Sequence, residues 1–217
     1  MITAQPDAPL GSVTKLREYT ASTFRSSDAV LCRNFAPLVK LAFQLIRKGV
    51  PCRVLGSEFA TQLEDLVDKS NTSDISSLRQ WLEAHCDEEL AAALKKNKQR
   101  LAQIIEEKYG CLLYLASQES TIQSLLYTLK SMFNDKASGY LTLSTIHKAK
   151  GLEWSRVFFL DPQLIPSKYA TQAWELAQET NLKYVGVTRA KIDLVYIESD
   201  KWEGQETTKE IREWDGE

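Results

Sequence analysis

The chain has 217 residues, of which 43% are hydrophobic and 26% are charged, and its formal net charge is −2. This composition is typical of a globular protein that can bury a core, as one domain or as one domain carrying an insertion. The small net charge argues against a histone-like or polybasic binder, but it permits a local basic patch.

The cysteines and the N-terminus exclude several classes of protein. No two cysteines form a CxxC pair, and the two histidines do not complete a zinc-type spacing. We therefore expect small buried thiols in a reducing compartment and no metal site. No signal-peptide pattern and no membrane-length apolar run occur, which predicts a cytoplasmic protein without a membrane partner. The cysteines are Cys32, Cys52, Cys86 and Cys111.

The two ends of the chain show no clear domain pattern. Residues 1–27 are rich in Pro, Ser and Thr and predict an extended lead-in, with at most one short strand near 13–16. Residues 199–217 are polar and acidic, which predicts a tail that forms one short helix or is disordered.

The stretch 28–56 has the pattern of a strand, a helix and a second strand. Apolar runs at 29–33 and 50–55 predict the strands. Between them Pro37 stands where a helix would begin, apolar residues recur at helical spacing, and Gly49 ends the pattern. Two strands joined by one helix predict a parallel crossover.

Residues 57–138 are almost free of Gly and Pro and predict an all-helical insertion subdomain. Asp74 is placed to cap the second helix. Apolar residues recur at helical spacing along the third and longest helix. The predicted helices are 59–68, 76–85, 88–109 and 120–133, and the apolar stripe consists of Leu90, Leu94, Leu101 and Ile105.

The α/β pattern resumes over 139–198. Three further apolar runs predict strands, and a helix is expected from about Tyr169. The chain as a whole therefore predicts an α/β fold with a parallel sheet flanked by helices. The additional strands are expected at 140–145, 156–161 and 193–198.

A basic turn separates two of these strands in the stretch STIHKAKGLEWSRVFFLD, residues 144–161. His147, Lys148 and the nearby Gly151 offer cationic side chains and backbone N–H groups that can approach a phosphate. Glu153 follows at a position where it could accept from a ribose hydroxyl. This pattern suits a nucleotide or a nucleic-acid backbone.

A second cluster, YVGVTRAK at 184–191, contains Arg189, whose bidentate fork suits a γ-phosphate. Each of these residues also has an ordinary explanation. The basic turn could be a solvated surface turn, Glu153 could pair with Arg156, and Arg189 could satisfy carbonyls at a helix end.

In combination, TIHKAKGLEW, VFFLD and YVGVTRAK resemble motifs V and VI of the UvrD/Rep-type superfamily 1 DNA helicases. AVLCRNFAPL and VPCRVLG, within 29–56, are similar to the family's motif IVa. The resemblance implies the second RecA-like motor domain, a P-loop-NTPase-type fold, formed by 28–56 and 139–198. The helical insertion at 57–138 would be a shortened form of the family's inserted subdomain.

The resemblance also implies a nucleotide site. Glu153 would contact the ribose, Gly151 would allow close backbone approach, and Arg189 would be the catalytic arginine that senses the γ-phosphate. Tyr184 would pack between motif VI and the nucleotide side of the sheet, and a plain core position fits it equally well. Propensity favours a strand at 184–188, but the resemblance implies a helix over 184–189, which we adopt.

The DNA contacts implied by the resemblance lie elsewhere. Thr145 and His147 would meet the DNA backbone, with Lys148 as a weaker candidate. Arg33 matches the motif IVa arginine and could contact a phosphate. Phe35 stands where the family commonly has Asn, and Asn34 stands one position earlier, so the amide contact is open. Phe35 could stack on a base or be buried under the following helix.

The sequence contains no G-x-x-x-x-G-K-[ST] motif and no early acidic Walker B pair. The chain alone is therefore expected not to hydrolyse ATP. ATP with Mg²⁺ would be held mainly by an N-terminal helicase motor domain acting in cis or in trans. The lead-in at Met1 fits a C-terminal piece of a longer helicase or one half of a split protein.

The function implied is therefore the C-terminal part of an ATP-dependent DNA helicase that moves 3′ to 5′ along single-stranded DNA. A protein partner for the helical insertion is also compatible with the pattern. An alternative is a non-catalytic helicase-like module that binds single-stranded nucleic acid or a protein partner. An unrelated α/β nucleotide-binding protein is a third alternative, which three ordered motifs disfavour.

Overall fold

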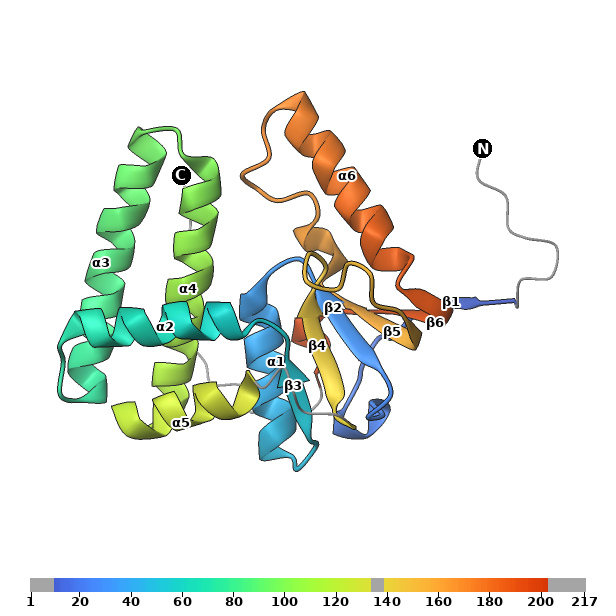
Figure 1. Ribbon diagram of the computed structural model, residues 1–217, viewed down its shortest axis with the longest axis horizontal. Coiled ribbons are helices and arrows are strands. Elements are labelled where there is room, and N and C mark those ends of the chain that lie inside the picture. Colours follow the sequence, from blue (N-terminus) through green and yellow to red (C-terminus); the bar gives the residue numbers. More distant parts are fainter. Residues whose placement is uncertain (1–9, 134–138, 203–217) are drawn as a thin grey trace.

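The computed structural model describes residues 10–133 and 139–202, and within them the strands form one six-stranded parallel sheet (Figure 1). The strand order is β1-β6-β5-β2-β4-β3. This confirms the expected α/β fold with a parallel sheet flanked by helices. The strands are β1 (Ser12–Lys15), β2 (Ala29–Cys32), β3 (Cys52–Val54), β4 (Leu141–Thr145), β5 (Trp154–Leu160) and β6 (Ala190–Ile197).

The central strands are apolar on both faces because both faces are covered. Successive side chains of a strand point to opposite sides of the sheet. In β2, Val30 and Cys32 join a large core, whereas Leu31 joins a smaller cluster on the other face. Continuous apolar runs are typical of parallel strands that helices cover on both sides.

Helix α1 (Phe35–Arg47) covers the face that carries the large core, with Leu38 and Leu45 fully buried. Pro37 lies in its first turn, where the missing N–H has no helical partner to lose. Gly49 has φ of 76° directly after the helix, as the sequence predicted for its end. The chain then enters β3, which pairs in parallel with β4.

Four helices lie between β3 and β4: α2 (Ser57–Ser70), α3 (Ile75–Lys95), α4 (Gln99–Gln118) and α5 (Ile122–Met132). Asp74 caps α3 as expected, since its Oδ1 accepts from the N–H groups of Ser76 and Ser77 at 3.0 and 2.9 Å. The predicted break at 86–87 is wrong, because α3 continues to Lys95.

The turn between α3 and α4 instead lies at 96–98, where Asn97 has φ of 52°, a left-handed conformation that Asn tolerates. The predicted third helix, 88–109, therefore ran across this turn and combined the end of α3 with the first half of α4. Its apolar stripe is divided between the two helices, and Leu94 and Leu101 are exposed. The missed signal was Asn97 in a run of lysines without an apolar residue.

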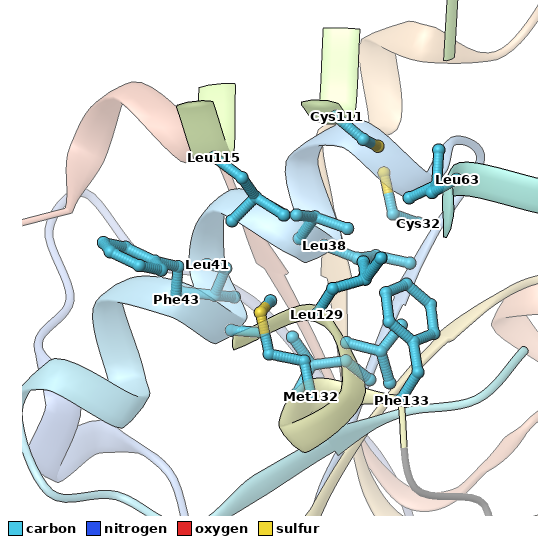
Figure 2. Close-up of a cluster of buried hydrophobic side chains, with 14 of the residues drawn as sticks. Cys32, Leu38, Leu41, Phe43, Leu63, Cys111, Leu115, Leu129, Met132 and Phe133 are labelled. Carbon is cyan, nitrogen blue, oxygen red and sulfur yellow. The ribbon is translucent and has the colours of Figure 1, made fainter. Parts of the chain in front are cut away.

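The helical segment shares its core with α1 and the sheet. Figure 2 shows Leu38 of α1 and Cys32 of β2 beside side chains from α2, α4 and α5. Leu112 and Leu129, from α4 and α5, are also fully buried. Burying such side chains contributes about 1.5–3 kcal/mol each. The packing ties the helices between β3 and β4 to the sheet, and the proposed division into domains stays a prediction.

Helix α6 (Ala173–Val187) covers the opposite face of the sheet, and it begins four residues after the predicted start at Tyr169. The helix that the resemblance implied for 184–189 is correct over 184–187, but α6 ends at Val187, so Arg189 lies outside it. Gly186 explains why α6 comes so close, since a Cβ there would lie 2.7 Å from the Phe159 ring and 3.2 Å from Ile146.

The ends of the described chain pack at one border of the sheet. The predicted short strand near 13–16 is β1, which pairs with β6. Tyr19 and Trp202 form an isolated parallel bridge, and their rings meet edge to face at 5.5 Å. The rest of the predicted tail, 203–217, and the first residues of the lead-in lie outside the described residues. None of the described helices has the length and apolarity to cross a membrane.

Candidate nucleotide and nucleic-acid site

The loop 146–153, which contains the basic turn and is called the basic loop below, joins the carboxyl end of β4 to the amino end of β5. Thr142 and Val157 both pair with Ala29 and therefore lie at the same level of the sheet. Thr145 lies three residues above that level and Trp154 three residues below it, a separation of about 20 Å at ~3.3 Å per residue. The loop thus connects a carboxyl edge of the sheet with an amino edge.

Arg189 lies at the amino edge, two residues after the end of α6, and its guanidinium donates to groups of the α6 C-terminus and of the loop 146–153. Its Nε donates to the carbonyl of Val185 at 2.9 Å, and its Nη1 donates to the carbonyl of Leu152 at 3.1 Å. Its Nη2 donates to Thr188 Oγ1 at 3.1 Å. The side chain therefore satisfies a carbonyl at the end of a helix, which was one of the two explanations that the sequence allowed. It also lies beside the basic loop.

Glu153 and Gly151 lie next to Arg189 in this arrangement. The N–H of Trp154, the residue after Glu153, donates to the carbonyl of Arg189 at 3.0 Å. Glu153 is half-exposed and pairs with Lys191 at 3.5 Å, so its suggested pairing with Arg156 does not occur. Gly151 has φ of 86° and open space where a Cβ would stand. The structure thus brings together three of the residues proposed to contact the nucleotide.

Tyr184, the fourth proposed nucleotide contact, is 53% exposed. The alternative of a plain core position is therefore wrong for this residue. It lies one turn before Arg189 on α6, where an exposed phenol ring is available to a ligand or to a neighbouring domain.

Arg156 pairs with Asp28, away from the amino edge of the sheet. Its guanidinium donates to Asp28 Oδ1 at 3.1 Å and to Oδ2 at 2.5 Å, and it also binds the carbonyl of Thr23. Asp28 is almost fully buried. This pair holds the segment before β2 against β5 and takes no part in the amino edge.

Thr145 and His147 follow β4 at the carboxyl edge. Thr145 is buried, and its Oγ1 accepts from the N–H of Lys148 at 3.4 Å, which shapes the start of the loop. Lys148 itself reaches Glu58 of α2 with its Nζ at 2.5 Å, and both side chains are largely exposed. Of these three residues, Lys148 presents the most accessible charge.

His147 lies in a positive environment. Burial lowers the pKa of His147, and the charges of Arg33 and Arg100 lower it further, while Glu179 acts in the opposite direction. The imidazole is therefore neutral near pH 7 and can offer a hydrogen bond but no full charge. Arg100 belongs to α4, so the helical segment contributes to the potential at this edge.

Arg33 follows β2 at the same edge and forms a nearly buried ion pair with Glu179 of α6. Its Nη2 lies 2.8 Å from Glu179 Oε1, and its Nε lies 3.0 Å from Oε2. The side chains are 11% and 10% exposed. Burial alone would raise the pKa of Glu179, but the hydrogen bonds and charge of Arg33 and the N–H of Ser167 hold it below its ordinary value.

A polar network extends from this pair to α4. Gln103 accepts from Arg33 Nη2 at 3.3 Å and donates to Asn34 Oδ1 at 3.4 Å. It also donates to Glu107 at 3.0 Å, and burial raises the pKa of that carboxyl group. Phe35 stacks on Phe59 of α2 with ring centroids 4.0 Å apart. One face of the Phe35 ring is therefore already covered by another ring.

Sequence reasoning missed Glu179, Gln103 and Arg100, which all lie near Arg33 or His147. A signal for Glu179 was available, because Leu182 and Gly186 follow it at helical spacing on the face that packs against the sheet. An acidic residue on a buried helix face requires a partner. Gln103 and Arg100 had no comparable signal, since only the fold brings α4 to this edge.

Three of the four cysteines are buried, as the sequence predicted, and Cys86 is the exception. Cys32, Cys52 and Cys111 are buried free thiols, and Cys86 is half-buried. Burial raises the pKa of the Cys52 thiol to about 12. Across residues 10–133 and 139–202, no group of three or more His, Cys, Asp or Glu side chains is placed to hold a metal ion.

Comparison with known proteins gives the same family as the motifs. The model of the UvrD-like helicase C-terminal domain matches residues 57–201. The chain is 32% identical over 130 residues to the ATP-dependent DNA helicase srs2 of Schizosaccharomyces pombe, which covers 50% of the chain and 14% of that relative. It is 41% identical over 69 residues to DNA helicase II of Escherichia coli, covering 30% of the chain and 10% of the relative.

The chain is also 41% identical over 69 residues to DNA helicase II of Salmonella typhimurium. The matched segments span 14% of the first relative and 10% of the other two. The family match covers more than half of the chain and includes both the basic loop and Arg189. The chain therefore belongs to the family of UvrD-like helicase C-terminal domains.

Proposed function

We propose that the chain is the C-terminal motor part of an ATP-dependent DNA helicase, with a nucleotide contact at the amino edge of its sheet and a strand contact at the carboxyl edge. The observation that carries the proposal is the bonding of Arg189 to the end of the basic loop. Arg189 binds the carbonyl of Leu152, and its own carbonyl accepts from Trp154. The family match and the helicase relatives support the same assignment.

At the amino edge, the residues would contact the γ-phosphate and the ribose of a nucleotide. They form only part of a nucleotide site. Arg189 would place its guanidinium against a γ-phosphate and stabilise the negative charge that spreads over it during transfer. Glu153 would accept from the ribose, and the open space beside Gly151 admits close approach. Bound ATP with Mg²⁺ would supply the bond that is cleaved and the neutralising charge. The ligands for that ion would come from an N-terminal motor domain.

At the carboxyl edge, the proposed strand contacts come from two adjacent strands. Arg33 and Asn34 follow β2, while Thr145, His147 and Lys148 follow β4. Phosphate contacts from such groups are independent of base sequence. The neutral His147 and the Lys148 charge would hold a single-stranded backbone at the surface, and the buried Thr145 would contribute by shaping the start of the loop that carries them.

The loop 146–153 and α6 both run between the two edges. Ile146 and Ala149 of the loop are fully buried beneath α6, so the loop cannot shift without repacking that helix. Closure of the cleft around ATP would therefore move the strand contacts together with Arg189, a hinge-type cycle. Movement 3′ to 5′ along the strand belongs to this proposal.

The test is reconstitution with an N-terminal motor domain that carries a Walker A motif. The mixture should hydrolyse ATP in the presence of single-stranded DNA, whereas this chain alone should not. Arg189→Ala should abolish the restored activity, by roughly 10³-fold or more if the arginine acts on the γ-phosphate. Lys183→Ala, which removes an exposed charge from the same helix, should leave it unchanged.

Strand binding is measured separately with a labelled oligothymidylate at low salt. The affinity of the chain should fall as salt rises, because phosphate contacts release counterions. If Arg189→Ala retained full activity in the reconstituted motor, the γ-phosphate role would be wrong. Strand binding without any restored ATPase would instead favour a non-catalytic helicase-like module.

A further inference from the structure

Glu179 occupies the guanidinium of Arg33, the residue that the proposed function assigns to a strand phosphate. Two parallel hydrogen bonds join them, with Arg33 Nη2 at 2.8 Å from Oε1 and Nε at 3.0 Å from Oε2. This fork is the geometry with which arginine also binds a phosphate. A carboxylate and a phosphate group therefore cannot use the same face of Arg33 at the same time.

We propose that Glu179 is a gate for strand binding: its carboxylate holds Arg33 in the strand-free protein, and a backbone phosphate must displace it. This inference rests on the proposed function, since it concerns the same carboxyl edge. Glu179 is a positioning residue here, because it acts through Arg33 and touches no substrate.

The surroundings of Glu179 allow it to release Arg33. Its Oε2 also accepts from the N–H of Ser167 at 3.0 Å, so the carboxylate keeps one partner after the exchange. The charges of Arg33 and Arg100 both act on His147 beside this pair, and the charge of Glu179 opposes them. An arriving phosphate would be attracted by the two arginines.

The gate also links the two edges of the sheet. Glu179 lies in the first half of α6, and the same helix ends two residues before Arg189. Gln103 joins the pair from α4, since its Oε1 accepts from Arg33 and from Ser167 Oγ at 3.3 Å each. Exchange at Arg33 would therefore change the contacts that α6 makes with both β2 and the helical segment.

The test compares the wild-type chain with Glu179→Gln in binding to a labelled oligothymidylate at low salt. Removal of the competing charge should tighten binding by about tenfold, within the usual range for coupling between two contacts. The matched control is Glu106→Gln, which removes the same charge from the exposed Lys168–Glu106 pair on α4. Equal effects of the two substitutions would overturn the gate, because they would reflect net charge alone.

A double-mutant cycle locates the effect at Arg33. In an Arg33→Ala background, Glu179→Gln should no longer change the affinity, since the group that the gate controls is absent. A gain in affinity that persisted without Arg33 would contradict the proposal. If the wild type bound the strand and Glu179→Gln bound it equally well, the gate alone would fail. If neither bound it, the strand contact in the proposed function would fail as well.

A measurement on the wild-type chain covers the case in which Glu179→Gln does not fold. The Nε–Hε resonance of Arg33, assigned with Arg33→Lys, should shift when the oligothymidylate is added. A resonance that stays in place while anisotropy reports binding would show that Arg33 keeps Glu179, and would overturn the proposal.

Discussion

The Arg189 guanidinium donates to the carbonyl of Leu152 at 3.1 Å, which joins the end of α6 to the end of the basic loop. A second hydrogen bond joins the same two segments, since the Arg189 carbonyl accepts from the N–H of Trp154 at 3.0 Å. Two sequence clusters that lie far apart in the chain are therefore held as one surface. Arg189 has a structural role in this state, and its proposed γ-phosphate contact would use a guanidinium that is already oriented.

Arg189→Ala is expected to lower the free energy of unfolding by about 1–2 kcal/mol, since two half-buried hydrogen bonds and one exposed hydrogen bond from a charged group are lost. Lys191→Ala is the control, because the Lys191–Glu153 pair is exposed at both ends and should contribute less than ~1 kcal/mol. Urea unfolding measures both values. Equal losses for the two variants would contradict a bracing role for Arg189.

Gly186→Ala is expected to destabilise the fold by about 1–3 kcal/mol, because the added methyl would overlap the Phe159 ring and press on Ile146. Gly110→Ala, in the interior of α4, meets no atom within 4 Å and should stabilise the chain by roughly 0.5–1 kcal/mol. Thermal unfolding gives the two signs directly. Destabilisation by both substitutions would mean that the close approach of α6 is not the cause.

Asp28→Asn is expected to cost about 3–5 kcal/mol, since it leaves the Arg156 charge without its nearly buried partner. Glu64→Gln breaks the more exposed Lys130–Glu64 pair and should cost less than ~1 kcal/mol. Denaturant unfolding compares the two. A small loss for Asp28→Asn would show that water replaces the carboxylate oxygen at Arg156.

Acid should weaken the fold partly through Glu179, whose pKa is held below its ordinary value in the folded chain. Burial acts against this shift, but the hydrogen bonds and charge of Arg33 and the Ser167 N–H outweigh it. A carboxyl group with a depressed folded pKa stabilises the fold above its unfolded pKa, near 4.3. That contribution is lost as pH falls through the folded pKa.

The measurement is the unfolding free energy between about pH 6 and pH 3, using the unperturbed Glu pKa near 4.3 as reference. Wild type should lose stability more steeply below pH 4.3 than Glu179→Gln, whose side chain does not titrate. Parallel curves for wild type and Glu179→Gln would exclude the ion pair as a source of acid sensitivity.

The sequence by itself determined the α/β class, most strands, the presence of four helices between two of those strands, and the family. Strand runs such as 29–32 and 157–160 are apolar on both faces, and that signal survives without tertiary information because it reflects burial on two sides. The motifs placed Gly151, Glu153 and Arg189 in one candidate site, and the structure brings them together.

Only the tertiary structure decided which partners these residues have and which helix ends where. The Lys95–Lys96 region carries no apolar signal, so the turn at Asn97 depended on how α3 and α4 pack. The pairing of Arg33 with Glu179 joins residues 146 positions apart, and only the sheet order and the crossing of α6 bring them into contact. Local sequence determines periodicity and propensity, but ion pairs across a sheet depend on long-range packing, which no local pattern encodes.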